Sequence, residues 1–324
     1  MKYLLCKPEG GFIDNLRTIE KCLEYCLKFN RILLINTCHS FTYRINFSDY
    51  FNFKKLPIIC DLKKIKYILS KRFLTVYPSS LKKNILNFKV KKDKKNNYYW
   101  IGDKNKKPLI INLKKKYSFD ILVVQSSDIG GDSFKMFKLL RFNNNIIKDF
   151  IKKFNKIDTP YLCIQIRNTD RDCDYKKLYY ENQELIKNQK VIYIATDDFK
   201  ALEFFRTKNL NIFNFTTFPK NNRPLHYSLL NSDLKIKDCI SDLILIGLSN
   251  ILLSNSIGGY IRLAKEINKN KEIIFDKIND NKLNILKSIL QRRKIASNNI
   301  ELFGIINLKF NSLKITNNII KFLI

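Results

Sequence analysis

The stretch Tyr161–Asp174, YLCIQIRNTDRDCD, decides how the rest of the sequence is interpreted. Its apolar run, Tyr161–Ile166, stops at a charged loop that contains Arg167 and Asp170. A short run of β-forming residues that ends abruptly in a charged loop predicts a buried strand. Ligands of open α/β sheets bind at the carboxyl ends of the strands. An arginine at such an end, with carboxylates beside it, suits an anionic substrate such as a diphosphate.

On both sides of this stretch the sequence alternates predicted strands with predicted helices. The other expected strands are 3–6, 31–36, 119–125, 191–195, 210–213, 251–253 and 272–275. The expected helices are 16–27, 63–73, 137–154, 175–187, 198–206, 237–247, 260–267 and 281–290. Such alternation predicts parallel sheets, and therefore an α/β fold with two Rossmann-like domains facing a cleft.

We place the domain boundary near residue 155, because the helix-breaking run Asp158-Thr159-Pro160 follows a predicted helix. Residues 1–155 form the N-terminal domain and residues 156–324 the C-terminal one. The N-terminal domain carries a lysine-rich insertion near 80–116, in which Tyr98–Ile101 and Leu109–Leu113 are expected to pair as a hairpin.

The charge balance favours an anionic partner. The chain of 324 residues has 60 Lys and Arg against 29 Asp and Glu, a formal net charge of +31. Such an excess attracts nucleic acid, acidic membranes or phosphorylated substrates. A drift of surface positions toward lysine in an AT-rich genome explains many of these charges equally well. For the basic and aromatic segment 82–116, a nucleic-acid surface, an acidic-membrane or acceptor surface and a solvated face all stay open.

Cysteine and histidine usage does not favour a metal site. The eight cysteines form no C-x-x-C pair, and the chain has two histidines, His39 and His226. Reduced thiols of a cytosolic protein fit better. The sequence shows no signal peptide, and its longest apolar region, Leu243–Leu253, is short of the roughly 20 residues of a membrane span. We therefore expect a cytoplasmic protein, soluble or peripheral at the inner face of a membrane.

Four loops follow predicted strands and are candidate binding loops: 7–12, 167–174, 196–198 and 254–259. Each also has a purely structural explanation. Gly10-Gly11 suits a tight turn, Asp197 and Asp198 suit helix N-caps, and 254–259 suits a cap followed by a turn. Asp170 is a candidate general base or part of a solvated turn, and Arg167 an anion ligand or part of a structural salt bridge.

Four segments resemble the metal-independent fucosyltransferases, a family that includes the α1,6-fucosyltransferases and the protein O-fucosyltransferases. IQIRNTD resembles their H-x-R-R-x-D element, and IYIATDD is similar to their second strand motif. SDLILIGLSNILLSNSIGGYIRLAKE is similar to their third region, and PEGGFIDNLRTIEKCLEYCLKFNRILLI to their opening glycine loop and helix. The four segments cover the first 36 residues and about 161–266, in the family's order.

The resemblance implies a GT-B fold that binds GDP-fucose through its C-terminal domain and the acceptor largely through its N-terminal domain. It also implies inversion at the anomeric carbon without a metal. Arg167 matches the arginine that grips the β-phosphate, and Glu9 lies where protein O-fucosyltransferases have a proposed base. The other matching positions are Gly10 and Gly11 of the glycine loop, Asp197 of the ATDD motif, Asp242 at the guanine-binding carboxylate, and Ser254, Asn255 and Ser256 at the phosphate-contacting serines.

Two positions depart from the family pattern. Gln165 replaces the histidine that helps to hold guanine, and Asn168 replaces the second arginine. The resemblance therefore specifies the transfer chemistry more firmly than the donor.

We expect a glycosyltransferase that moves fucose or a related sugar from GDP to a hydroxyl of a glycan or lipid-linked saccharide, in the synthesis of a surface polysaccharide or glycoconjugate. The alternatives are a transferase with another nucleotide-sugar donor, a basic nucleic-acid-binding protein, and an inactive GT-B binding module.

Overall fold

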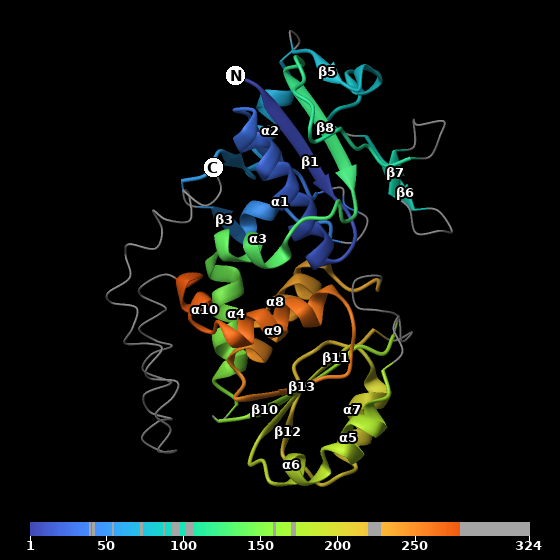
Figure 1. Ribbon diagram of the computed structural model, residues 1–324, viewed down its shortest axis with the longest axis vertical. Coiled ribbons are helices and arrows are strands. Elements are labelled where there is room, and N and C mark those ends of the chain that lie inside the picture. The colour runs from blue at the N-terminus through green and yellow to red at the C-terminus, as the bar shows by residue number, and fades with distance from the viewer. Residues whose placement is uncertain are drawn as a thin grey trace. The chain divides into compact units, whose positions relative to one another are not determined.

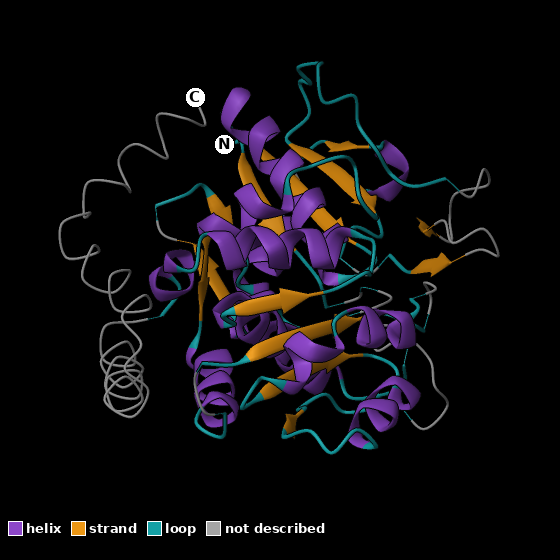
Figure 2. Ribbon diagram, turned by 60° about the horizontal axis from the view of Figure 1, so that its bottom comes forward, coloured by secondary structure: helices purple, strands orange, loops and turns teal. Residues whose placement is uncertain are grey.

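The computed structural model describes residues 1–278 except 39, 41–42, 54, 72–73, 87, 93–97, 101–106, 158–159, 170–172 and 220–227. The predicted helix 281–290 and the rest of the C-terminal segment lie outside the described residues. The chain forms two compact units: Met1–Asn143 belong to the first, and the second begins at Asn144. Each unit has its own sheet with helices packed against it (Figures 1 and 2).

The first unit is built on a parallel sheet in the order β4-β2-β1-β8-β5. Its central strand β1 (Tyr3–Pro8) is buried along its whole length, as is its neighbour β8 (Ile121–Ser126). The remaining elements are α1 (Phe12–Lys28), β2 (Ile32–Ile35), η1 (Phe47–Asp49), β3 (Phe51–Phe53), β4 (Ile58–Ile59), α2 (Leu62–Leu69), β5 (Val76–Tyr77), η2 (Ser79–Leu81), β6 (Val90–Lys92), β7 (Tyr98–Trp100), α3 (Ser133–Leu139) and β9 (Leu140–Phe142).

The second unit contains a parallel sheet in the order β12-β11-β10-β13. Its interior strand β10 (Leu162–Ile166) is the apolar run on which the sequence interpretation is based, and all five of its residues are buried. The other elements are α4 (Asn144–Phe154), α5 (Tyr175–Glu181), α6 (Gln183–Lys187), β11 (Ile192–Thr196), α7 (Phe199–Arg206), β12 (Ile212–Phe213), α8 (Ser232–Leu248), β13 (Ile251–Leu253), α9 (Gly259–Lys269) and α10 (Glu272–Asp276).

Alternation of side chains along β10 explains the layers of the second unit. Leu162, Ile164 and Ile166 share a core with residues of α5 and α7, including Leu178 and Phe205. Because successive strand residues point to opposite faces, Cys163 and Gln165 face the other way. The helix α8 contacts β10, and the hydroxyl of Tyr161, just before the strand, donates to a carbonyl of α8. The strand β10 therefore lies between α5 and α7 on one face and α8 on the other.

Three local predictions are wrong. Residues 272–275 form the helix α10, not a strand. The expected helix 137–154 is interrupted by β9, which pairs antiparallel with β3. Tyr98–Trp100 pairs with Val90–Lys92 instead of 109–113, and Leu109 forms an isolated bridge with Gln125. In the first two cases a short apolar run fits a helix and a strand equally well. In the third case Tyr98–Trp100 is a strand as expected, but its partner is Val90–Lys92.

Candidate functional site

The carboxyl ends of β10, β11 and β13 bring three of the four predicted loops together in the second unit. The three strands are parallel, with β10 between the other two. The backbone N–H of Arg167 donates to Oγ of Ser256 at 2.9 Å, so the loop after β10 is attached to the loop after β13. The Arg167 side chain is half-buried at this edge. The sequence prediction that these loops share a site is therefore consistent with the geometry of the strand ends.

Asp197 fixes the conformation of the arginine loop. Its Oδ1 accepts the backbone N–H of Asn168 at 3.0 Å, and its Oδ2 accepts the Thr169 hydroxyl at 2.6 Å. Asp198 plays a different part, because its carboxylate caps α7 through the N–H of Lys200 and also accepts from the Asn168 amide. Asp198 is thus a helix cap, whereas Asp197 holds the loop that follows Arg167 in place.

The loop Ser254–Ser256 is also held from both sides. The Ser254 hydroxyl donates to Oε1 of Gln165 at 2.8 Å, and the Ser256 N–H donates back to Ser254 Oγ. The Asn255 amide donates to the carbonyl of Asp174, while its oxygen accepts the Cys173 thiol. Gln165 therefore positions the serine loop.

The loop leads into α9 through Gly258, whose φ of +133° is a conformation that L side chains rarely adopt. The N-terminus of α9 has no side-chain cap. Unsatisfied N–H groups at a helix start carry partial positive charge and suit phosphate. With Arg167 at the same edge of the sheet, the serine loop and the first turn of α9 provide donors of the kind that a diphosphate requires.

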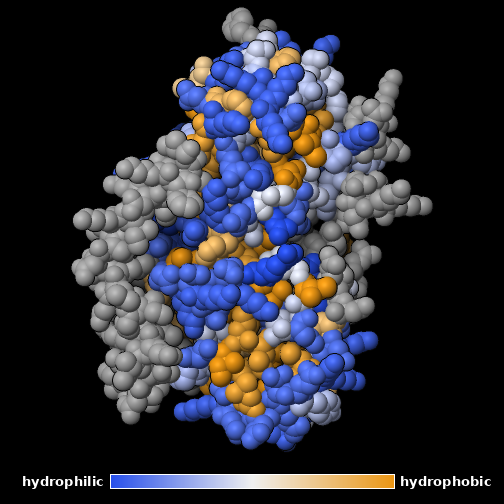
Figure 3. Space-filling view, in the orientation of Figure 1, coloured by the Kyte–Doolittle hydropathy of each residue, from blue (hydrophilic) through white to orange (hydrophobic). Residues whose placement is uncertain are grey.

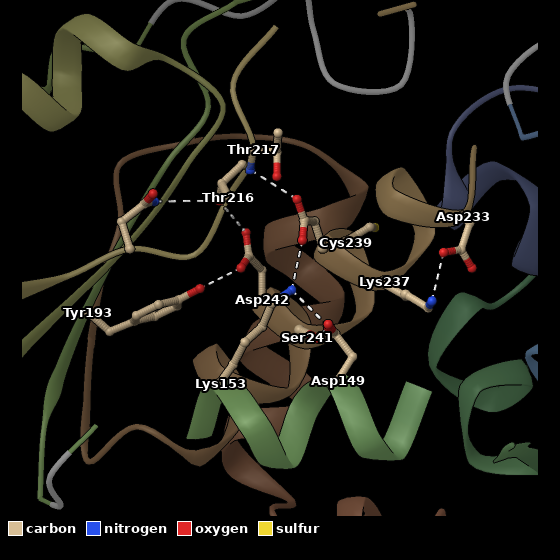
Figure 4. A network of polar contacts seen from close by, with 12 residues as sticks. Asp149, Lys153, Tyr193, Thr216, Thr217, Asp233, Lys237, Cys239, Ser241 and Asp242 are labelled. Atoms are coloured by element: carbon tan, nitrogen blue, oxygen red, sulfur yellow. Dashed lines mark hydrogen bonds and ion pairs between the residues drawn. The ribbon is translucent and has the colours of Figure 1, made fainter. Parts of the chain in front are cut away.

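Asp242 lies in a buried polar network between β11, α8 and the chain after β12 (Figure 4). One carboxylate oxygen accepts the Tyr193 hydroxyl and the other accepts the Thr216 hydroxyl at 2.9 Å. On the next turn of α8, Asp238 pairs with Lys153 at 2.7 Å and accepts the N–H of Thr217. Burial raises the pKa of Asp242 to about 6, against the hydrogen bonds that lower it.

The raised pKa makes the stability contribution of Asp242 depend on pH. The folded state holds this proton up to about pH 6, whereas an unfolded chain releases it near its ordinary value of 3.8. The group therefore adds stability as the pH falls from about 6 toward 4, on the order of 1 to 3 kcal/mol. We expect the Asp242→Asn variant to lose this dependence. Denaturant titrations at pH 5 and pH 7.5 measure it as the change in the stability difference between wild type and variant.

The matched control is Asp233→Asn, which removes a carboxylate of the same helix whose ion pair with Lys237 is part-exposed. The control variant should keep the pH dependence of the wild type. The prediction fails if the stability difference between Asp242→Asn and wild type is the same at both pH values. That result would show that the pKa of Asp242 is not raised in the folded state.

The first unit holds the remaining predicted residues, at the carboxyl end of β1. The Glu9 side chain is fully buried, and its Oε2 accepts the Ser40 hydroxyl at 3.2 Å. Gly10 has a φ of +87°, and the N–H of Gly11 donates to the Asp14 carboxylate at 2.9 Å. The two glycines therefore shape the turn into α1, and the Gly11 amide is used within that turn. Asp170 lies outside the described residues.

Lys7 was not singled out from the sequence, although it lies two residues before Glu9. Its Nζ donates to the carbonyl of Phe88 at 3.0 Å and lies 3.7 Å from the centroid of the Phe88 ring. Burial lowers the pKa of Lys7 to about 8, and the nearby Glu9 carboxylate raises it in part. Other residues missed from the sequence are Thr169 and Cys173, which join the binding loops, and Thr216, whose hydroxyl meets Asp242.

Within the described ranges, no group of three or more His, Cys, Asp or Glu side chains could hold a metal ion. No helix in that part of the chain combines the length and the apolar character needed to cross a bilayer.

The sequence matches no protein-family model and no curated protein. Solved structures resemble the fold. A NodZ α-1,6-fucosyltransferase soaked with GDP-fucose superposes with a TM-score of 0.55 at 12% identity, covering 82% of this chain and 92% of that one. NodZ from Bradyrhizobium gives 0.54 at 11% identity, over 82% and 92% of the two chains. POFUT1 in complex with GDP-fucose gives 0.51 at 12% identity, over 82% and 94%. The chain thus has the α/β fold of GT-B fucosyltransferases.

Proposed function

We propose that the chain is a glycosyltransferase that transfers a sugar from a GDP-linked donor, with GDP-fucose as the first candidate, to a hydroxyl of a glycan. One observation carries the proposal. Arg167, the loop Ser254–Ser256 and the uncapped start of α9 meet at the carboxyl edge of one sheet. The fold on which they meet is shared with two fucosyltransferases solved with GDP-fucose.

In this proposal the second unit binds the donor. The diphosphate lies against the serine loop and the first turn of α9, and the Arg167 guanidinium neutralises the charge that develops on the leaving GDP. Asp197 supports catalysis indirectly, because its carboxylate accepts the Asn168 backbone N–H and the Thr169 hydroxyl and so holds the loop that follows Arg167. The positive charge that the departing diphosphate needs comes from the protein, so the transfer requires no metal.

The nucleobase would lie on the side of the diphosphate where β11 and β12 end. Phe199 begins α7 next to the cap Asp198, is 48% exposed, and packs edge-on against Phe218 at 5.5 Å. An exposed aromatic ring that is supported by a partly buried one offers a surface on which a base can stack. Asp242 would support this side indirectly by holding Thr216, since both of its oxygens accept hydrogen bonds within the chain.

Glu9 is our candidate for the base that deprotonates the acceptor hydroxyl, and attack by that oxygen on the face opposite GDP would invert the anomeric carbon. Its carboxylate is fully buried beside Ser40. The residues that bury it must therefore move before an acceptor hydroxyl can reach it. The acceptor would then bind to the first unit.

The proposal is tested by donor turnover. We expect slow release of GDP from GDP-fucose without an acceptor, and faster release when a glycan mixture from the native cell surface is added. UDP-sugars, assayed alongside, should give at least about tenfold lower rates, because a site that pairs with guanine rejects a base that leaves its polar groups unpaired. If a UDP-sugar is turned over faster, the proposal of a GDP-linked donor is wrong, but the proposal of a glycosyltransferase stands. Absence of turnover and of nucleotide binding would leave a GT-B binding module.

A further inference from the structure

The positive charge of the chain is unevenly distributed. Residues 62–92, about a tenth of the sequence, contain ten of the 60 Lys and Arg residues and none of the 29 Asp and Glu residues. They contribute ten of the 31 net positive charges. A general drift toward lysine adds basic residues everywhere but does not remove acidic ones from one segment. This segment contains α2, β5, η2 and β6 of the first unit.

Parts of this segment pack against the five-stranded sheet, of which β5 is an edge strand. The segment's apolar residues Ile65, Ile68, Leu81 and Phe88 are buried in the same core as sheet residues that include Leu34. The lysines between them therefore lie on the side away from this core. The exposed ones are Lys63, Lys64, Lys66, Lys71, Lys82, Lys83, Lys89 and Lys91. Hydrophilic residues also cover most of the face of the molecule seen in Figure 3, so exposed charge by itself does not single out this segment.

The helix α2 differs from the rest of the segment because an exposed aromatic residue, Tyr67, lies among its exposed lysines. Tyr67 is 69% exposed and forms a row with Lys63, which lies four residues before it on the helix, while Lys71 follows the end of α2 at Leu69. The Nζ of Lys71 is 5.1 Å from the centroid of the Tyr67 ring. Lys64 and Lys66 flank this row and are exposed. We call these five residues the α2 face.

We propose that the α2 face docks on the anionic surface of a lipid bilayer. Four exposed lysines complement a layer of negative head groups. Tyr67 has the amphipathic ring that is favoured at the boundary between water and lipid. Stacking of successive nucleobases uses several rings along a groove, whereas the α2 face offers one ring.

Docking at this face must be electrostatic rather than insertive. The apolar side of α2, with Ile65, Ile68 and Leu69, is already buried in the core of the first unit. It cannot turn into the acyl region without unfolding that core. Binding should therefore weaken steeply with salt, since exposed charges are screened over about 10 Å at 0.1 M salt.

The test uses the full chain and vesicles of phosphatidylcholine, with or without one third phosphatidylglycerol. We expect binding to the anionic vesicles only, and its loss at high salt. Replacing Lys63, Lys64, Lys66 and Lys71 with Gln should lower the partition coefficient by up to about 600-fold, given about fivefold for each of the four lysines near a membrane. Tyr67→Ala alone should lower it about threefold.

The matched control replaces Lys152, Lys176, Lys187 and Lys190, four exposed lysines of the second unit, with Gln. It removes the same charge and should retain most of the binding. Equal losses in the two quadruple variants would overturn the proposal, because net charge alone would then explain the binding. Binding to DNA or to a soluble polyanion, but not to the vesicles, would overturn it as well. GDP affinity should be equal in all these variants, so this result is independent of the proposed transfer reaction.

Discussion

The Arg167→Ala variant should lose about a thousandfold in kcat/KM for the GDP-sugar while keeping the fold. The contact that attaches this loop to Ser256 is made by the backbone N–H of Arg167, not by its side chain. What the variant loses is the guanidinium, a fixed positive charge where the leaving diphosphate becomes more negative. Removal of one preorganised group of this kind typically costs about 100- to 1000-fold in rate, and more for an arginine on a phosphoryl group.

Two further variants make this result specific. Arg167→Lys retains the charge but not the planar fork, so it should recover only part of the activity. Arg206→Ala removes an exposed arginine of α7 that pairs with Glu203, and it should retain wild-type turnover. Donor consumption measures all three, and a thermal melt confirms that each is folded. Turnover near the wild-type level in Arg167→Ala would remove this residue from the mechanism.

The second large effect is on stability. Gly131 lies in the loop before α3 and presses against the helix α1. A Cβ at this position would lie 2.0 Å from the backbone oxygen of Arg17. Because the obstacle is backbone in the middle of a helix, the contact cannot be relieved by a change of rotamer. We expect Gly131→Ala to lower the free energy of unfolding by about 3 kcal/mol, at the upper end of overpacking effects.

The neighbouring Gly130→Ala is the matched control. A Cβ there meets no atom within 4 Å, although the φ of +84° is unfavourable for alanine. That strain alone should cost about 1 kcal/mol. Chemical denaturation of the two variants separates the steric from the conformational effect. Equal losses in both would show that the α3 loop does not pack on α1 as closely as described.

The sequence identified the elements that form the core but not the partners of individual side chains. The ends of strands could be predicted because a strand is a local apolar run in the sequence. The direction of the chain then shows which end is the carboxyl end, where ligands of parallel sheets bind. That reasoning placed Arg167, Asp197 and Ser256 at one edge of the second sheet, where the structure has them. It left Asp197 and Asp198 open between binding residues and helix caps. Only the fold shows that Asp198 caps α7 while Asp197 holds the arginine loop.

Asp242 illustrates the same limit. Its spacing in the sequence matched a carboxylate that contacts guanine, but the spacing did not predict that its two oxygens accept the hydroxyls of Tyr193 and Thr216. These partners come from β11 and from the chain after β12. Contacts between residues so far apart in the sequence cannot be predicted from a local sequence pattern. Likewise, the run 140–142 is helical by local pattern, and its pairing with β3 makes it a strand.

The central claim is that the second unit binds a guanine nucleoside diphosphate through Arg167 and the loops around it. Calorimetric titration of the full chain with GDP, UDP, CMP and ADP, repeated with Arg167→Ala, tests it most directly. The account predicts selective binding of GDP and at least about a tenfold loss of affinity in the variant, as for a charge-assisted hydrogen bond of roughly 1.5 to 3 kcal/mol. Equal GDP affinity in the wild type and the variant, or no binding of any nucleotide, would contradict it.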